Sequence, residues 1–326
     1  MPIIAKTTYS PPFLFRNTHV QSIYPTFFRK IKGVNYVRER ILTPDSDFID
    51  LDWSRVGADK TVIISHGLEG HSRRSYMLGM IKAFNSRGWD GVAFNFRGCS
   101  GEPNRLLRSY HSGATEDLHT VVSHVLKQKS YTSLSLIGFS IGGNLTLKYI
   151  GEMSSTLSPL IKSAAAISAP CDLESSSWKL SERSNILYMK RFLKMFHDKI
   201  QLKMQIMPDK INDKDYKSIR TFKEFDDRYT APIHGFSSAQ EYWSKCSCKQ
   251  FITGIKIPTL LISAQDDPFL PQECYPVEEA EDSRYLFLEM PESGGHVGFI
   301  DFKPNGEYWH ETRVASFITD TDTEIN

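Results

Sequence analysis

The sequence predicts an α/β fold in which a mostly parallel central sheet is flanked by helices and interrupted by an inserted helical cap. Short apolar runs of the buried-strand type alternate with amphipathic helical stretches, which is the order that parallel βαβ units require. Residues 171–251 break this order, because they carry charged helical patterns and no good strand. A stretch of that length is too long for a loop, so it indicates a cap.

The elements can be placed along the chain from these patterns. Residues 1–35 form an aromatic, proline-containing arm without a clear period, which we expect to pack on the core. Strands are expected at 36–42, 48–54, 61–65, 91–96, 134–137, 164–168, 259–263 and 285–288, and helices at 74–87, 114–128 and 141–152. The core then comprises 36–170 and 252–318, the cap comprises 171–251, and the polar tail at 319–326 is expected to fray.

The composition excludes several classes of function. The 326 residues include 39 basic and 38 acidic side chains, and this net charge of +1 gives no basic surface for nucleic acid. No apolar run reaches the roughly 18 residues of a membrane helix, and the first residues lack the apolar region of a signal peptide. We therefore expect a cytoplasmic protein.

The cysteines give no sign of a disulfide framework or a metal site. There are five, an odd number scattered along the chain, which indicates reduced thiols. Cys246 and Cys248 have no second pair at ligand spacing, so no metal is expected. No nucleotide-binding motif is present, so we expect no cofactor, and nothing in the pattern indicates a protein partner.

The motif Gly-Phe-Ser-Ile-Gly at 138–142 follows a predicted strand and opens a predicted helix. This is the G-x-S-x-G nucleophile elbow of the α/β-hydrolase fold, in the structural context that the motif requires. The sharp turn holds the serine backbone in strain, and side chains at Gly138 and Gly142 would collide there. Ser140 is therefore the predicted nucleophile.

An elbow serine needs a carboxylate and a histidine that follow it in that order. His296 lies in a glycine-rich loop after the last predicted strand and is the predicted base, whereas His310 lies in a helical pattern and is expected to pack. The acid should follow strand 259–263, where Asp266 and Asp267 compete. Asp267 is favoured because the following Pro268 holds the loop away from helix.

The oxyanion hole is expected to use two backbone N–H groups. One belongs to Ile141, the residue after the nucleophile, and the other to a loop after an early strand. That loop reads Ser-His-Gly-Leu-Glu-Gly at 65–70, and Leu68 is the predicted second donor.

The cap carries an apolar stripe at helical spacing, made of Met189, Phe192, Leu193 and Phe196. Two interpretations stand equally: the stripe packs the cap onto the core, or it lines an acyl pocket. Lysines and an arginine lie among these residues, so a transient contact with an anionic membrane surface is a weaker expectation.

With these residues assembled, the chain resembles the YheT-like family of α/β-hydrolase-fold lipolytic enzymes, over about residues 12 to 318. The resemblance rests jointly on Asn17–Ser22, His66–Gly70, Asn95–Gly101, Tyr110–Gly113, Thr230–Phe236, Asp266–Phe269 and Gly294–Gly298. Ser22 departs from it, because threonine is expected there. The resemblance implies a carboxylesterase or acylglycerol-lipase-like activity with Ser140, Asp267 and His296 as its triad, and it supports the inserted cap.

Three functions are considered. A serine hydrolase of small-molecule acyl esters leads, and an acyltransferase that passes the acyl group to an alcohol is the alternative. A non-catalytic binding protein on the same fold comes last, because all the triad positions are intact.

Overall fold

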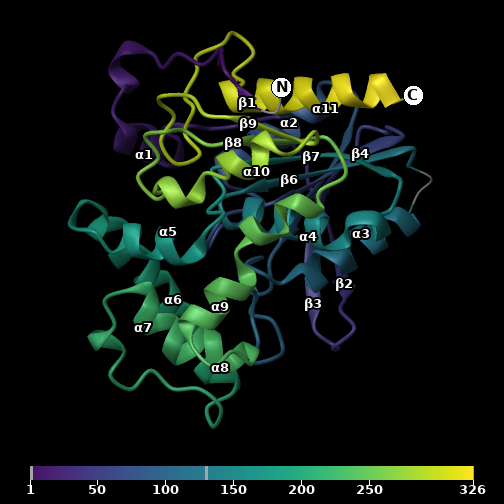
Figure 1. Cartoon of the computed structure of the whole chain (residues 1–326). Helices are drawn as coiled ribbons and strands as arrows, with labels where there is room; N and C mark the ends of the chain where they lie inside the picture. The colour runs from purple at the N-terminus through teal and green to yellow at the C-terminus, as the bar shows by residue number, and fades with distance from the viewer. Residues whose placement is uncertain (1–2, 129–130, 326) are drawn as a thin grey trace.

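The computed structural model describes residues 3–128 and 131–325, and a nine-stranded sheet runs through this described part of the chain (Figure 1). The strands are β1 (Ile3–Ile4), β2 (Val37–Leu42), β3 (Phe48–Ser54), β4 (Lys60–Ser65), β5 (Asp90–Asn95), β6 (Ser133–Phe139), β7 (Ile161–Ile167), β8 (Thr259–Ile262) and β9 (Leu286–Glu289). Their order is β1-β9-β8-β7-β6-β4-β5-β3-β2. β3 is antiparallel to both β2 and β5, and all other neighbours are parallel.

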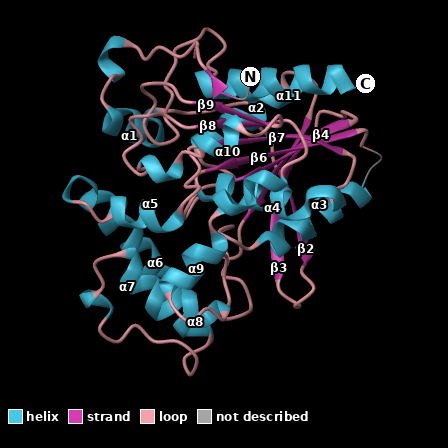
Figure 2. Cartoon of the chain, in the orientation of Figure 1, coloured by secondary structure: helices cyan, strands magenta, loops and turns pink. Residues whose placement is uncertain are grey.

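Helices cover both faces of the sheet (Figure 2). One face packs on α3 (Thr115–Gln128), α4 (Ile141–Met153) and α10 (Val277–Glu281), and the other packs on α2 (Ser75–Asn85) and α11 (Trp309–Ile325). Side chains alternate between the two faces along a strand: on β4, Ile63 lies in one core while Val62 and Ile64 lie in the other. Such strands read as continuous apolar runs, and the predicted fold class is confirmed.

Residues 171–251 leave the sheet between β7 and β8 and form a layer of helices beside it (Figure 1). These helices are α5 (Leu173–Leu180), α6 (Ile186–Ile206), α7 (Phe222–Phe225), α8 (Ala231–His234) and α9 (Ala239–Cys246). A π-helical turn, Asp226–Thr230, joins α7 to α8. Most members of a separate apolar cluster come from this segment, and Phe269 of the core completes the cluster. We refer to residues 171–251 as the cap.

The arm contains a helix that the apolar pattern did not predict. α1 (Thr18–Phe28) begins at Asn17, whose side chain accepts hydrogen bonds from the amides of His19 and Val20. This helix buries the polar Gln21 and the helix-breaking Pro25, and it exposes apolar residues. Its hydrophobic period is therefore the reverse of the usual one, which explains why the sequence appeared to lack a period.

The tail at 319–326, which was expected to fray, is helical in its described residues. α11 continues to Ile325, and Asn326 lies outside the described part of the chain. Asp322 is buried, and its Oδ2 accepts a hydrogen bond from Lys60 Nζ at 2.6 Å. The polar sequence of the tail did not indicate this contact, because Lys60 lies 262 residues away from Asp322.

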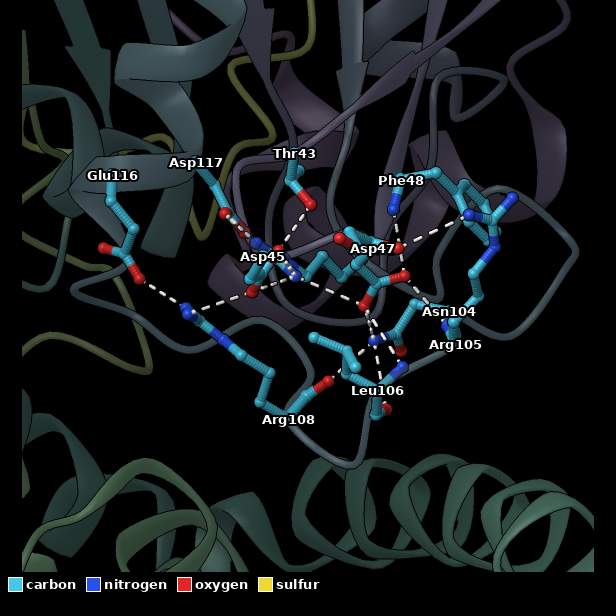
Figure 3. A network of polar contacts seen from close by, with 12 residues as sticks. Thr43, Asp45, Asp47, Phe48, Asn104, Arg105, Leu106, Arg108, Glu116 and Asp117 are labelled. Carbon is cyan, nitrogen blue, oxygen red and sulfur yellow. Dashed lines mark hydrogen bonds and ion pairs between the residues drawn. The ribbon is translucent and has the colours of Figure 1, made fainter.

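A buried ionic network fixes the loop that follows β5 (Figure 3). Arg97 lies 2.9 Å from Asp45 and 2.6 Å from Asp117, which come from the β2–β3 hairpin and from α3. Asn104 donates a 2.6 Å hydrogen bond to Asp47 of the same hairpin. The loop after β5 is therefore bound to the β2–β3 hairpin and to α3. Its residues form part of the walls of the cavities described below.

Candidate active site

Ser140 lies at the turn between β6 and α4 in a strained backbone conformation with a positive φ of 54° and a ψ of −122°. A Cβ on Gly138 would lie 2.1 Å from the carbonyl oxygen of Gly142. A Cβ on Gly142 would lie 2.5 Å from the carbonyl oxygen of His66. Because the obstacles are backbone atoms, neither position has room for a side chain, and the turn lifts the Ser140 hydroxyl above the sheet.

The structure brings the three predicted triad residues together. His296 Nε2 lies 3.0 Å from Ser140 Oγ, and His296 Nδ1 lies 2.9 and 3.1 Å from the two carboxylate oxygens of Asp267. The side chain of Asp267 is buried, and its Oδ1 also accepts a hydrogen bond from the amide of Phe269. Carboxylate, imidazole and hydroxyl therefore form one continuous chain.

Asp266 takes a different place. Its Oδ1 accepts a 2.9 Å hydrogen bond from the amide of Gly295, and its backbone oxygen accepts one from Thr18 Oγ1 at 2.6 Å. Burial raises the pKa of Asp266 above its ordinary value. This carboxyl group supports the backbone of the histidine loop, whereas Asp267 contacts the imidazole.

The arm supports the histidine loop from the other side, a role that the sequence did not reveal. Ser22 Oγ accepts a 2.9 Å hydrogen bond from the amide of His296 and donates one to the carbonyl of Thr18. A Cβ on Gly295, which has φ 57°, would lie 2.6 Å from that same carbonyl. A Cβ on Gly298 would come within 2.6 Å of the Gln21 carbonyl. The glycines of this loop therefore allow α1 to approach closely.

Both predicted oxyanion donors lie beside the nucleophile. Ile141 is the first residue of α4, so its N–H has no carbonyl one turn earlier to bind. Gly67 approaches so closely that a Cβ there would lie 3.2 Å from Ser140 Cβ, which places the following residue, Leu68, at the same opening. His66 is fully buried and accepts a hydrogen bond from the Phe96 amide through Nε2, and burial lowers the pKa of His66 to about 3. It is a neutral structural residue.

Comparisons with known proteins agree with this geometry. The family model described as alpha/beta hydrolase fold matches residues 60–303. The putative esterase YheT of Escherichia coli is 34% identical over 94% of this chain and 91% of its own length. The chain is a YheT-like α/β hydrolase.

More distant relatives carry lipolytic names. Phospholipase ABHD3 of mouse is 30% identical to the hydrolase over 92% of this chain and 75% of its own length. Monoacylglycerol lipase of Saccharomyces cerevisiae is 27% identical over 94% and 68%. Among solved structures, the esterase Pf2001 of Pyrococcus furiosus has the same fold, with a TM-score of 0.59 and 19% identity over 97% of this chain and 98% of that one.

A cavity of about 240 Å³ opens at Ser140 between the cap and the sheet of the hydrolase. Phe192 and Phe196 of α6 line it, together with Phe269 from the core. Met189 and Leu193 of the same helix are buried in the cluster inside the cap and do not line this cavity. The predicted stripe therefore divides: Met189 and Leu193 are buried in the cap, whereas Phe192 and Phe196 pack against the same cluster and also line the cavity.

A second cavity, of about 120 Å³, lies next to the first. Leu68, Phe196 and Asp226 line both. Asp226 is half-buried, and its carboxylate accepts a 2.9 Å hydrogen bond from the indole N–H of Trp243. Burial raises the pKa of Asp226 to about 7, against the effect of this hydrogen bond.

The cap is also tied to the oxyanion loop. Glu69 follows Leu68 and has a left-handed φ of 52°. Its Oε1 lies 2.9 Å from Lys199 Nζ of α6, and Tyr110 donates it a 2.6 Å hydrogen bond. The hydroxyl oxygen of Tyr110 also accepts a hydrogen bond from the backbone N–H of Glu69. A strained residue beside the predicted oxyanion hole is therefore held by a cap helix.

The five cysteines of the hydrolase are buried and free. Within residues 3–128 and 131–325, no group of three or more histidine, cysteine or acidic residues is placed to hold a metal ion. In the same ranges, no helix is both long and apolar enough to cross a bilayer.

Proposed function

We propose that the protein is a serine carboxylic-ester hydrolase that acts on acyl esters through an acyl-enzyme. The observation that carries this proposal is the placement of His296, with one ring nitrogen 3.0 Å from Ser140 Oγ and the other 2.9 Å from Asp267. The esterase and lipase names among the relatives support the same reaction class.

In the first half of the reaction, His296 Nε2 takes the proton of Ser140 as Oγ attacks the carbonyl carbon of the ester. Asp267 keeps the other proton on Nδ1 and stabilises the imidazolium that forms. The N–H groups of Leu68 and Ile141 bind the oxyanion, and the positive end of α4 adds to their effect. His296 then gives its proton to the departing alcohol.

In the second half, water enters the site and His296 takes its proton. The hydroxide attacks the acyl-enzyme, the carboxylic acid leaves and Ser140 recovers its proton. An alcohol in place of water would give a new ester. Acyl transfer is therefore the alternative outcome of the same intermediate.

The cavity supports a lipophilic acyl chain as the substrate group. Its walls carry Phe192, Phe196 and Leu180 from the cap, and Phe269 from the core. Burial of an acyl chain there contributes about 0.8 kcal/mol for each CH₂ group. The relatives named phospholipase and monoacylglycerol lipase support esters of glycerol as the natural class. Five buried free thiols are compatible with a reducing compartment such as the cytoplasm.

A fluorophosphonate probe tests the nucleophile, because it reacts with serines activated by an adjacent base. We expect the wild type to be labelled, and Ser140→Ala to fold normally and remain unlabelled. Equal labelling of both proteins would refute the assignment. Turnover of a butyryl ester, measured with and without glycerol, separates the two products: free acid marks hydrolysis and a glycerol ester marks transfer.

A further inference from the structure

The outer face of the arm is apolar. α1 turns Gln21 and Pro25 inward, and the opposite positions Val20, Ile23 and Phe27 repeat at helical spacing and are exposed by 39%, 39% and 64%. We define the arm face as these three residues together with three further exposed apolar residues of the arm: Phe13, Leu14 and Phe28.

Ring contacts extend part of this face into a continuous aromatic band. Tyr24 lies 4.9 Å from Phe28 and 4.8 Å from Phe15, measured between ring centroids. Phe15 in turn lies 5.2 Å from Phe302, whose side chain is 58% exposed. Contiguous exposed apolar surface of this kind marks an interaction site.

The charge of the arm is of one sign. The first 38 residues contain six lysines and arginines and no acidic residue. Arg29 and Arg38 are paired with core carboxylates, but Arg16, Lys30 and Lys32 are exposed and make no ion pair with any residue of the described ranges. The apolar face is therefore accompanied by free positive charge, which favours an anionic partner.

Helix α1 also forms part of the cavity at Ser140. Ile23 and Thr26 line it from the arm. His19 of α1 contacts Tyr188 of α6, with 3.1 Å between His19 Nδ1 and the tyrosine oxygen. Beside Tyr188, the cap exposes Leu187 by 77%. In Figure 1, α1 and the cap helices α5 and α6 lie on the same side of the molecule. The apolar arm, the exposed start of α6 and the cavity thus adjoin one another.

We propose that the arm face docks on the surface of an anionic lipid bilayer, where it places the cavity against the acyl chains. Apolar side chains on a helix with nearby lysines and arginines are the combination that binds such a surface without spanning it. Docking itself is independent of catalysis. Only the delivery of a lipid ester to Ser140 rests on the function proposed above.

The test measures binding by flotation with large vesicles, made either of phosphatidylcholine alone or of phosphatidylcholine and phosphatidylserine in equal parts. We expect the full-length protein to bind the mixed vesicles more tightly, and this binding to weaken as salt is added. The double variant Phe27→Ser/Phe28→Ser should bind them roughly tenfold less tightly. Lys30→Gln/Lys32→Gln should weaken binding to the mixed vesicles only.

A matched control is available on the opposite edge of the sheet. Val37 and Leu42 of β2 are 65% and 66% exposed, as Phe27 and Phe28 are at 64% and 66%, so Val37→Ser/Leu42→Ser should bind like the wild type. All three double variants should hydrolyse a soluble acetyl ester at the wild-type rate, which shows that they are folded. Ser140→Ala should bind vesicles normally while it loses hydrolysis, which separates a failure of docking from a failure of the proposed function.

Two results would overturn the proposal. The first is equal vesicle binding by the wild type and the Phe27→Ser/Phe28→Ser variant, or no binding by either. The second is a dimer in sedimentation that this variant abolishes while vesicles bind neither form, which would assign the arm face to a second copy of the chain.

Discussion

Asp266 and Asp267 are neighbours with the same side chain, and the structure gives them separate tasks. Asp267 contacts the imidazole of His296, and Asp266 binds the amide of Gly295 in the loop that carries it. The sequence favoured Asp267 through the adjacent proline and left Asp266 open. The local backbone decides between them: the chain turns here, with the Asp267 amide donating a hydrogen bond to the Ala264 carbonyl, and the two side chains reach different partners.

These two carboxylates can be separated by turnover. We expect Asp267→Asn to reduce kcat by roughly 10³–10⁴ without unfolding the protein, because the neutral amide no longer holds the productive histidine tautomer. Asp266→Asn keeps an acceptor oxygen for Gly295, so its loss should be far smaller. Both are checked with a soluble ester and a melting curve. The reverse ranking would transfer the catalytic role to Asp266.

Ser22 is expected to be a positioning residue. Ser22→Ala removes the acceptor for the His296 amide, so the imidazole should be held less accurately, and kcat should fall between about tenfold and a hundredfold with little change in KM. Ser22→Thr restores a hydroxyl and should restore kcat. A fall in melting temperature that the threonine variant corrects, without any effect on kcat, would show that the contact only stabilises the fold.

Residues of the site differed in how far the sequence could reveal them. Ser140 lies in a local motif, and His296 follows from chain order and a glycine-rich loop, so short windows sufficed. Ser22 and Glu69 act through partners 274 and 130 residues away, respectively the His296 amide and Lys199. No local pattern records such contacts.

At the scale of the element, adjacent residues of α6 have different surroundings: Phe192 lines the cavity and Leu193 is buried in the cap. Phe192→Ala widens the cavity and should slow octanoyl esters more than acetyl ones, because the acyl chain loses a burial contact. Leu193→Ala is the matched control: it lies in the cap core, so it should lower the free energy of unfolding by about 2–5 kcal/mol and keep the chain-length profile. Rates on acetyl, butyryl and octanoyl esters, with melting temperatures, check both. An unchanged profile for Phe192→Ala would exclude the acyl pocket at this wall.

The π-helical turn that carries Asp226 should make stability depend on pH. Because the folded protein holds the pKa of Asp226 at about 7, above its ordinary value, the native state binds a proton that the unfolded chain has released. Stability from this group is full below the unfolded pKa and is lost as pH rises toward and through about 7. Asp226→Asn should remove that part of the decline. Denaturant unfolding from pH 4 to 8 measures the free energy of unfolding at each pH. The same dependence on pH in the wild type and in Asp226→Asn would contradict the raised pKa of Asp226.

The positions of β2 to β9 were predicted closely, because buried parallel strands produce uninterrupted apolar runs, and those of α2, α3 and α4 were also predicted. α1 was missed for the opposite reason. A helix that buries glutamine and exposes phenylalanine produces no periodic signal of the usual sign, and only its Asn17 cap marks it.

Across the whole molecule, the Arg97 network joins the β2–β3 hairpin, the loop after β5 and α3. Arg97→Met leaves Asp117 buried without its counter-charge, and we expect the free energy of unfolding to fall by about 3–5 kcal/mol. Arg105→Met, on the exposed side of the same loop, should cost about 0.5 kcal/mol or less. Urea unfolding distinguishes them. Similar losses would show that the network adds little beyond surface charge.

The fold class followed from the sequence because it depends on the order of elements, whereas the closing contacts of the two ends did not. β1 pairs with β9, and Lys60 pairs with Asp322. Both contacts join segments that are distant in the sequence, and no local pattern indicates either of them.

The support that Ser22 gives to the His296 amide spans 274 residues, and it sets a time at which activity can begin. During synthesis, the arm leaves the ribosome long before the histidine loop does. Until both are present, the imidazole has no fixed position, however well the early strands have paired. The site around Ser140 is therefore completed only after the histidine loop has been synthesised. A chain that has been synthesised only as far as the cap carries Ser140 without His296 beside it.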